Sequence, residues 1–332
     1  MQKPSPTGIL HYAYGYWASA ILATSLRHDL FTHLESDPCD AVQLAERARL
    51  SPRGVQALLD ALLGMGLVRK ANVRTYENTS EASTYLVRGT PDYMGGYAGM
   101  ILGTWRHWDL LPEVVTHGKP LHKHENASSN DSYWEEVVPA LAPLGFPPAL
   151  AAAERLGISQ REEFASLDVG GGAGAFSVTW LKLNPRARCR QIDWPNVNEI
   201  ARRYVTGFGV ADRFETIDGD MEQLDLGEAR YDCVIYSNIA TGLSGPRNTA
   251  MLRKIKRALK PDGSLLIVSL VLNEDRTGDP LLLLFNANLI LNSEEGSLHR
   301  RVDYSAWLRE AAYSSVRFEP LADLPFTLIY AS

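Results

Sequence analysis

Apolar side chains recur on almost every turn of a predicted helix spanning residues 8–34. They are Ile9, Tyr12, Tyr16, Trp17, Ile21, Leu22, Leu26 and Leu30. A helix that is apolar nearly all round is a buried helix. At the N-terminus of a soluble chain such a helix is often buried against a second subunit. We therefore expect this segment to join two copies of the chain.

The pattern of residues 40–77 predicts a helix–turn–helix followed by a small hairpin. DAVQLAERARL forms the first helix, and Ser51 with Pro52 opens the second as N-cap and first helical residue. The strands LVRK and VRTYEN then pair as a wing. A DNA-binding winged helix needs a basic surface, but residues 35–88 hold seven basic and seven acidic residues. A structural or dimerisation role is favoured, and a DNA-binding regulator is the lesser alternative.

Residues 88–150 predict a mainly helical connector rich in aromatic residues and histidines. His122 and His124 flank Lys123 on opposite faces of an extended loop, so we expect no metal site there. The proline-rich stretch PLGFPPAL at 143–150 resembles a joint between domains. We therefore expect a helical domain over residues 1–150 and a second domain over residues 151–332.

The pattern changes near residue 160 to apolar strands alternating with helices. The strands are FASLDV, RCRQIDW, RFETID, YDCVIYS and GSLLIVSLV. This alternation predicts an α/β fold, with a parallel sheet covered by helices on both faces. SSVRFEP and FTLIYA at the end of the chain predict an antiparallel hairpin at one edge of the sheet.

Composition and charge narrow the class of protein. The chain has 332 residues, 45% of them hydrophobic, and 33 basic against 39 acidic residues give a net charge of −6. This balance argues against nucleic-acid and membrane partners. The cysteines at 39, 189 and 233 form no CxxC pair, which argues against a disulfide framework or a zinc site. The N-terminal residues lack the pattern of a signal peptide. We expect a cytoplasmic protein.

The motif LDVGGGAGAF at 167–176 places glycines between a strand and a helix. Glycine is needed where a turn has unusual backbone angles or where the backbone approaches a ligand closely. Ligands of open α/β sheets bind at this carboxyl edge. Because Gly170-x-Gly172-x-x-Ala175 also fits a relaxed dinucleotide fingerprint, the motif alone does not separate the two kinds of cofactor.

The next two strand ends favour an adenosyl cofactor other than a dinucleotide. Asp193 in QIDWP follows the second strand and can accept hydrogen bonds from ribose hydroxyls. Asp220 in IDGDM adds a polar contact where an adenine would lie, and Met221 can pack on the purine face. The alternatives are a strand-end cap for Asp193 and a turn residue for Asp220.

Together, LDVGGGAG, QIDWP, GDM and YDCVIYSNIATGL resemble the S-adenosylmethionine-dependent O-methyltransferases of small-molecule metabolism. The resemblance covers nearly the whole chain. It implies a class I methyltransferase domain, an N-terminal winged-helix-like dimerisation domain and a homodimer. It also implies S-adenosylmethionine as cofactor, with contacts at Gly170, Gly172, Asp193, Asp220, Met221 and Ser237. The stretch 285–297 faces substrate in this family, which points to Phe285 and Asn288, with Tyr133 and Trp134 closing the pocket. Each of these aromatic residues also fits an ordinary helix core.

The loop after the fourth strand departs from the family. Its members carry a catalytic histidine there, but this chain has Thr241 in its place, and His299 stands where the family has a glutamate. A phenol has a pKa of ~10, so ionising it at pH 7 costs about 4 kcal/mol. A threonine hydroxyl cannot serve as the base, whereas an imidazole can.

Three explanations remain open for this departure. His299 can act as the base, although it also fits a surface loop beside Arg300 and Arg301. Alternatively, the acceptor needs no base, because positioning of the two reactants alone supplies ~7 kcal/mol or more of the reduction in the barrier. The fold can also have kept the cofactor for chemistry other than methyl transfer, such as hydroxylation or a pericyclic reaction. We expect methyl transfer to an oxygen, nitrogen or carbon of an aromatic or polyketide-like small molecule in secondary metabolism.

Overall fold

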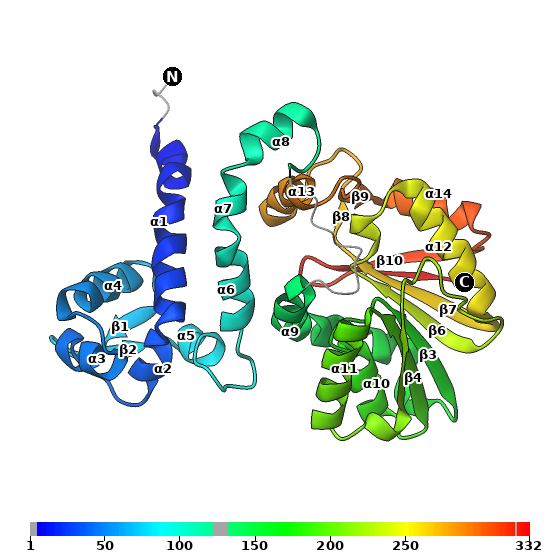
Figure 1. Cartoon of the computed structure of the whole chain (residues 1–332), viewed down its shortest axis with the longest axis horizontal. Helices are drawn as coiled ribbons and strands as arrows, with labels where there is room; N and C mark the ends of the chain where they lie inside the picture. Colours follow the sequence, from blue (N-terminus) through cyan, green and yellow to red (C-terminus); the bar gives the residue numbers. More distant parts are fainter. Residues whose placement is uncertain (1–4, 122–131, 323) are drawn as a thin grey trace. The chain divides into compact units, whose positions relative to one another are not determined.

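The computed structural model describes residues 5–121, 132–322 and 324–332, with the side chains of residues 132 and 133 left out. The chain folds into two compact units, Met1–Arg106 and His107–Ser332 (Figure 1). Our sequence-based boundary at 150 falls instead inside one long helix, α9 (Ser132–Leu156). That helix contains Pro139, Pro143, Pro147 and Pro148. Its buried packing on the second unit offsets the backbone hydrogen bonds that prolines remove.

The first unit begins with α1 (Thr7–Arg27) and α2 (Leu30–Glu35), where we expected one helix. Asp29 separates them because it adopts a left-handed conformation with φ of 50°. Most of α1 is exposed, including Ile9 at 75%, Tyr12 at 82% and Trp17 at 52%. The apolar helix therefore lacks a cover within its own unit, as expected of a helix that packs on another copy.

The helix–turn–helix and hairpin of the first unit are confirmed. α3 (Ala41–Ala48) is followed by α4 (Pro52–Gly64), and the Ser51 hydroxyl caps α4 by accepting a hydrogen bond from Gly54 N at 3.1 Å. The strands β1 (Val68–Lys70) and β2 (Tyr76–Asn78) pair antiparallel. The unit also contains α5 (Ser80–Tyr85) and α6 (Gly95–Gly103), and α7 (Trp105–Trp108) spans its boundary with the second unit.

The second unit is built on a seven-stranded sheet in the order β10-β11-β7-β6-β3-β4-β5. Its strands are β3 (Phe164–Val169), β4 (Ala187–Asp193), β5 (Phe214–Asp218), β6 (Tyr231–Ser237), β7 (Leu259–Ser269), β10 (Val316–Pro320) and β11 (Thr327–Ala331). β3 to β7 run parallel, and β10 and β11 form the expected antiparallel hairpin. The order reverses between β3 and β6, which is the point where open sheets bind ligands.

Helices cover both faces of this sheet (Figure 1). α9 and α10 (Ala175–Leu183) pack on one face, and α12 (Gly245–Ala258) and α14 (Arg301–Glu310) pack on the other. α11 (Pro195–Gly207) lies beside α9 and β5. The unit also contains α8 (Leu111–His117), α13 (Pro280–Asn292), the short 3-10 helices η1 (Ile158–Gln160), η2 (Ala211–Arg213) and η3 (Ala240–Gly242), and the parallel pair β8 (Val271–Leu272) and β9 (His299–Arg300).

Residues Trp134–Leu156 of α9 are long and apolar enough to cross a membrane, with 23 residues and a mean hydropathy of 1.3. Core helices of soluble proteins pass the same test. Here Trp180 Nε1 of α10 donates a hydrogen bond to Ala149 O at 2.9 Å. A Cβ on Gly145 would stand 2.7 Å from the Cβ of Ala175, so the two helices are in close contact. We therefore interpret α9 as a core helix of the second unit.

Candidate functional site

The glycine-rich turn after β3 has the backbone that only glycine adopts readily. Gly170, Gly172 and Gly174 have φ values of 69°, 57° and 79°. Gly170 N donates a hydrogen bond to Ile192 O at 2.8 Å, which ties the turn to the end of β4. α10 then begins at Ala175. The turn therefore holds the first amides of a helix at the carboxyl edge of the sheet, a site suited to polar ligands.

Side chains fill the space around this turn on the protein side. A Cβ on Gly170 would meet Ile239 Cδ1 at 2.5 Å, and a Cβ on Gly171 would meet Gln191 Oε1 at 2.5 Å. Gly172 has more room, because its nearest neighbour would be Val138 Cγ1 of α9 at 3.8 Å. The positive φ thus favours glycine at position 170, and a Cβ there would also require the end of the Ile239 side chain to move.

Asp193 at the end of β4 holds the turn by hydrogen bonds. Its Oδ2 accepts from Gly172 N at 2.9 Å, and its Oδ1 accepts from Trp194 N at 2.8 Å. Burial raises the pKa of Asp193 to about 6, although these two backbone hydrogen bonds oppose the shift. Each oxygen keeps a further lone pair that can accept a hydrogen bond from a ligand hydroxyl.

Asp168 is a buried acid that our sequence reasoning passed over. It lies in β3 directly under the turn, is 1% exposed, and neither of its carboxyl oxygens has a hydrogen-bond partner. Burial first and the charge of Asp193 second raise its pKa to about 8, so the carboxyl is mainly protonated at pH 7. An acid inside the apolar strand FASLDV was the signal that could have identified it.

A second polar turn, the cofactor turn (residues 219–224), follows β5. Asp220 Oδ1 accepts a hydrogen bond from Glu222 N at 2.8 Å. Lys254 of α12 donates to Met221 O at 2.9 Å and to Glu222 O at 3.1 Å. Asp220 and Met221 therefore lie in a turn that Lys254 of α12 holds by hydrogen bonds to its carbonyls. The sequence did not reveal this contact.

The loop after β6 carries the position where the family has its histidine. Ser237 ends β6, Asn238 has a left-handed φ of 57°, and Ile239 turns back onto Gly170. Thr241 follows in η3 and is 7% exposed. Its carbonyl accepts a hydrogen bond from Ser297 N at 2.9 Å. The loop thus contacts both the glycine-rich turn and the acceptor segment (residues 293–299).

His299 lies against the same loop, so the structure brings it close to the segment that contains Thr241. Its ring packs on Trp307 of α14 with centroids 4.7 Å apart. Burial lowers its pKa, while the charge of Asp303 and backbone hydrogen bonds at Ala240 and Leu243 oppose the shift. The imidazole is therefore favoured in its neutral form. Its Nε2 is buried and without a hydrogen-bond partner, so it does not open directly to solvent.

The predicted acceptor-binding residues are divided between two helices. Trp134 of α9 packs near Val138 and Ala173, beside the glycine-rich turn. Phe285 of α13 packs against the core cluster on the α9 side of the sheet, and Asn288 accepts a hydrogen bond from Asn292 within α13. The side chain of Tyr133 lies outside the described residues, as do His122 and His124.

These residues fit the cofactor that the sequence resemblance implies. The turn has a positive φ at Gly170, and the amides at the start of α10 follow it. Half-buried Asp193 ends β4, and half-buried Asp220 follows the end of β5. S-adenosylmethionine carries ribose hydroxyls, a purine and two positive charges, which carboxylates and a methionine side chain can recognise. Gly170, Gly172, Asp193, Asp220, Met221 and Ser237 would hold it.

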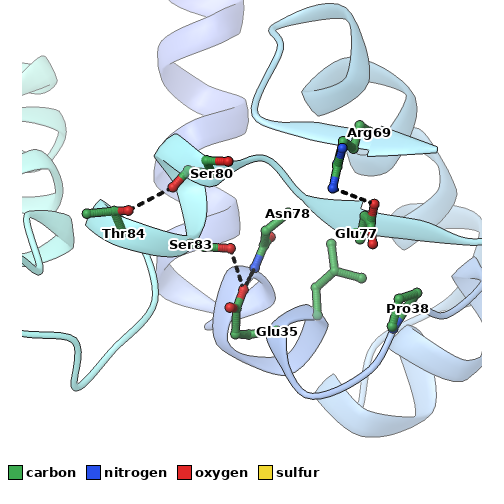
Figure 2. Close-up of a pocket in the computed structure, with 9 residues that line it drawn as sticks. Glu35, Pro38, Arg69, Glu77, Asn78, Ser80, Ser83 and Thr84 are labelled. Carbon is green, nitrogen blue, oxygen red and sulfur yellow. Dashed lines mark hydrogen bonds and ion pairs between the residues drawn. The ribbon is translucent and has the colours of Figure 1, made fainter. Parts of the chain in front are cut away.

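A cavity of about 400 Å³ lies in the first unit, and none of the proposed cofactor residues lines it (Figure 2). Its polar groups bind one another. Glu35 accepts hydrogen bonds from Asn78 Nδ2 and Ser83 Oγ, each at 2.7 Å, and Arg69 pairs with Glu77 at 2.9 Å. Asn78 Oδ1 has no partner but is buried. The cavity therefore offers a ligand few unsatisfied groups.

Comparison with known families identifies two parts of the chain. Residues 149–314 match the O-methyltransferase domain, and residues 10–88 match the O-methyltransferase dimerisation domain. These matches confirm the resemblance inferred from the glycine-rich motif and the strand ends.

Individual relatives are similar over nearly their whole length. The tetracenomycin polyketide synthesis 8-O-methyltransferase of Streptomyces glaucescens is 27% identical over 94% of this chain and 92% of its own. The 3-hydroxy-5-methyl-1-naphthoate 3-O-methyltransferase of Streptomyces sahachiroi is 28% identical over 94% and 90%. Bovine acetylserotonin O-methyltransferase is 27% identical over 92% of each chain.

Solved structures share the fold. A candidate O-methyltransferase from Nostoc punctiforme has a TM-score of 0.91 at 24% identity, covering 99% of both chains. Human N-acetylserotonin methyltransferase in complex with S-adenosylmethionine has a TM-score of 0.84 at 22% identity, covering 99% and 98%. The predicted class I methyltransferase architecture is confirmed.

Proposed function

Since the chain belongs to the O-methyltransferase family and is an S-adenosylmethionine-dependent methyltransferase, we propose that it methylates a hydroxyl oxygen of an aromatic or polyketide-like molecule in secondary metabolism. The observation that carries the proposal is the glycine-rich turn bonded to Asp193 at the reversal point of the sheet. Relatives whose names specify a naphthoate and a tetracenomycin polyketide support a fused-ring acceptor. A nitrogen or carbon acceptor is the alternative.

Bound S-adenosylmethionine supplies an electrophilic methyl group on a sulfonium. We propose that the protein contributes mainly by positioning. Asp193 and Gly172 fix the turn, Lys254 fixes the cofactor turn, and Ile239 holds the loop after β6 against Gly170. Alignment of two reactants in a fixed geometry supplies about 7 kcal/mol or more of the barrier reduction.

We propose His299 and Thr241 as the catalytic pair of this loop. His299 is held neutral by burial, which is the state of a proton acceptor. Its Nε2 is enclosed here, so accepting a proton from the substrate requires a shift of the acceptor segment. Thr241 supplies a hydroxyl and a smaller volume than the histidine that it replaces. Trp134, Tyr133, Phe285 and Asn288 remain our candidates for binding the acceptor.

We infer that the protein acts as a cytoplasmic homodimer without a nucleic-acid or membrane partner. The dimerisation domain and the exposed aromatic residues of α1 support this assembly. The winged-helix-like arrangement of α3, α4 and the hairpin would then serve dimerisation. Replacing Tyr12 and Trp17 by aspartate would bury charges in that interface, and light scattering coupled to gel filtration would report monomers. An unchanged mass would overturn this assignment of α1.

The function is tested with trideuteromethyl S-adenosylmethionine and a panel of naphthols, hydroxynaphthoates and polyketide phenols. Mass spectrometry should find the label on an acceptor oxygen, with an equal amount of S-adenosylhomocysteine. Amines and enolisable ketones in the panel test the other acceptor atoms. If the cofactor binds but stays intact while an acceptor is converted, the alternative of chemistry without methyl transfer replaces our proposal.

A further inference from the structure

Arg247 of α12 bonds to two segments that are far apart in the sequence. Its Nε donates to Glu222 Oε1 at 3.0 Å, and its Nη2 bonds the other oxygen of the same carboxylate. Its Nη1 donates to Glu295 Oε2 at 3.1 Å. Glu222 belongs to the cofactor turn and Glu295 to the acceptor segment, so one guanidinium links them.

Both ends of this link are held firmly. Glu222 N donates to Asp220 Oδ1, and Lys254, seven residues after Arg247, bonds the carbonyls of Met221 and Glu222. At the other end, Glu295 Oε2 also accepts from Ser244 N at 3.2 Å, at the start of α12. A carboxylate is favoured there by the helix dipole. The planar, five-donor guanidinium suits such a double contact better than an ammonium.

The acceptor segment extends this link to the loop after β6, which contains Thr241. Gly296 N donates to Ser293 Oγ at 2.8 Å, Ser297 N donates to Thr241 O at 2.9 Å, and Leu298 N donates to Asn286 Oδ1 of α13 at 2.8 Å. His299 follows directly. Hydrogen bonds, joined through the covalent chain at Glu222 and at residues 295–297, therefore connect the side chain of Asp220 to the backbone of Thr241.

We propose that Arg247 is a positioning residue that couples the occupancy of the cofactor turn to the order of the acceptor segment. This inference rests on the proposed function, because the ligand expected in the cofactor turn is the methyl donor. When the cofactor fixes Asp220 and Met221, Glu222 holds Arg247, and Arg247 holds Glu295 and the segment that carries His299. The acceptor site is then completed only when the methyl donor is present.

Hydrogen–deuterium exchange of the full-length protein tests this coupling, with S-adenosylhomocysteine as the probe. Saturating probe should slow exchange at the cofactor turn and also at the amides of residues 296–298. In Arg247→Gln, the turn should still be protected at saturation, but the protection of residues 296–298 should be lost. The Kd of the probe should rise by no more than about fivefold, since a partly exposed ion pair contributes up to about 1 kcal/mol.

Two further variants separate coupling from general destabilisation. Glu295→Gln cuts only the distal contact, so the probe should bind within about twofold of wild type while residues 296–298 lose their response. Arg253→Gln removes a pair of the same kind from the same helix, Arg253 with Glu310 at 2.8 Å, and should keep the response. If residues 296–298 stay protected in Arg247→Gln, or show no response in wild type, the coupling is refuted. Absence of any probe binding to wild type would instead refute the proposed function, and the coupling with it.

Discussion

Replacing Asp168 by asparagine should stabilise the protein without cofactor, and increasingly so as the pH rises. The buried carboxyl keeps its proton in the folded state up to a pKa of about 8, raised from 3.8. The unfolded chain releases that proton near pH 4. Between these values the folded state binds one more proton than the unfolded state, so the stability that the neutral acid provides below pH 3.8 is lost as the pH rises toward 8.

The size of the effect follows from the two pKa values. At pH 7, linkage puts the cost of Asp168 at about 4 kcal/mol, and the cost grows by about 2 kcal/mol between pH 6 and pH 8. An amide does not titrate, so the variant avoids this cost. The amide of the variant also has a hydrogen-bond acceptor close by, the unpartnered Gln191 Oε1. This atom and Asp168 Cγ each lie within 2.8 Å of the position that a Cβ on Gly171 would take.

The assay is urea unfolding at pH 6, 7 and 8 without cofactor, followed by tryptophan fluorescence. Trp180 and Trp194 report on the second unit. The difference in unfolding free energy between Asp168→Asn and wild type should widen with pH. Asp225→Asn is the control, because hydrogen bonding from Gly227 N lowers the pKa of that exposed carboxyl and keeps it ionised over this range. Parallel curves for Asp168→Asn and wild type would refute the assignment of a protonated acid.

Three further results are expected. The affinity for S-adenosylmethionine should fall below pH 6, because Asp193, whose pKa burial raises to about 6, then gains a proton and loses acceptor capacity. Calorimetry should show that Asp193→Asn binds the cofactor more weakly and without this pH dependence. An unchanged pH profile would rule out the contact. His299→Gln should lower kcat/KM by about a hundredfold and remove a rise in rate with pH centred below 6.5, and a retained rise would place the base elsewhere. Gly170→Ala should destabilise the fold more than Gly172→Ala. The positive φ costs each variant about 1–2 kcal/mol, but only the Cβ of the first would also collide with Ile239. Equal melting temperatures would contradict this prediction, and Ile239→Ala should relieve the collision.

Local patterns in the sequence were sufficient for most of the secondary structure. β3 and β6 have the limits that their apolar runs suggest, and α4 begins at the Ser51–Pro52 signal. These features depend on side-chain periodicity and on capping, which act within a few residues. The proline-rich stretch at 143–150 does not end a helix, because burial of α9 against α10 outweighs a local signal for a break.

The position of the proposed cofactor residues in the fold also followed from the sequence. The motif order placed Gly170, Gly172, Asp193 and Asp220 at one edge of a parallel sheet, since the carboxyl ends of neighbouring parallel strands meet there. Arg247 carried no local signal. It is one of several arginines on an amphipathic helix, and only the packing of α12 sets it between Glu222 and Glu295.

Short-range patterns and residue types were enough to predict the α/β class, the edge of the sheet where the proposed cofactor residues lie, and the absence of a histidine at position 241. Three features depend on long-range packing instead: Asp168 is buried without partners, His299 packs against the loop that contains Thr241, and Arg247 joins the two segments. The physical reason is that desolvation and long-range hydrogen bonds depend on which surfaces meet when the chain folds, and no pattern within a few residues specifies them.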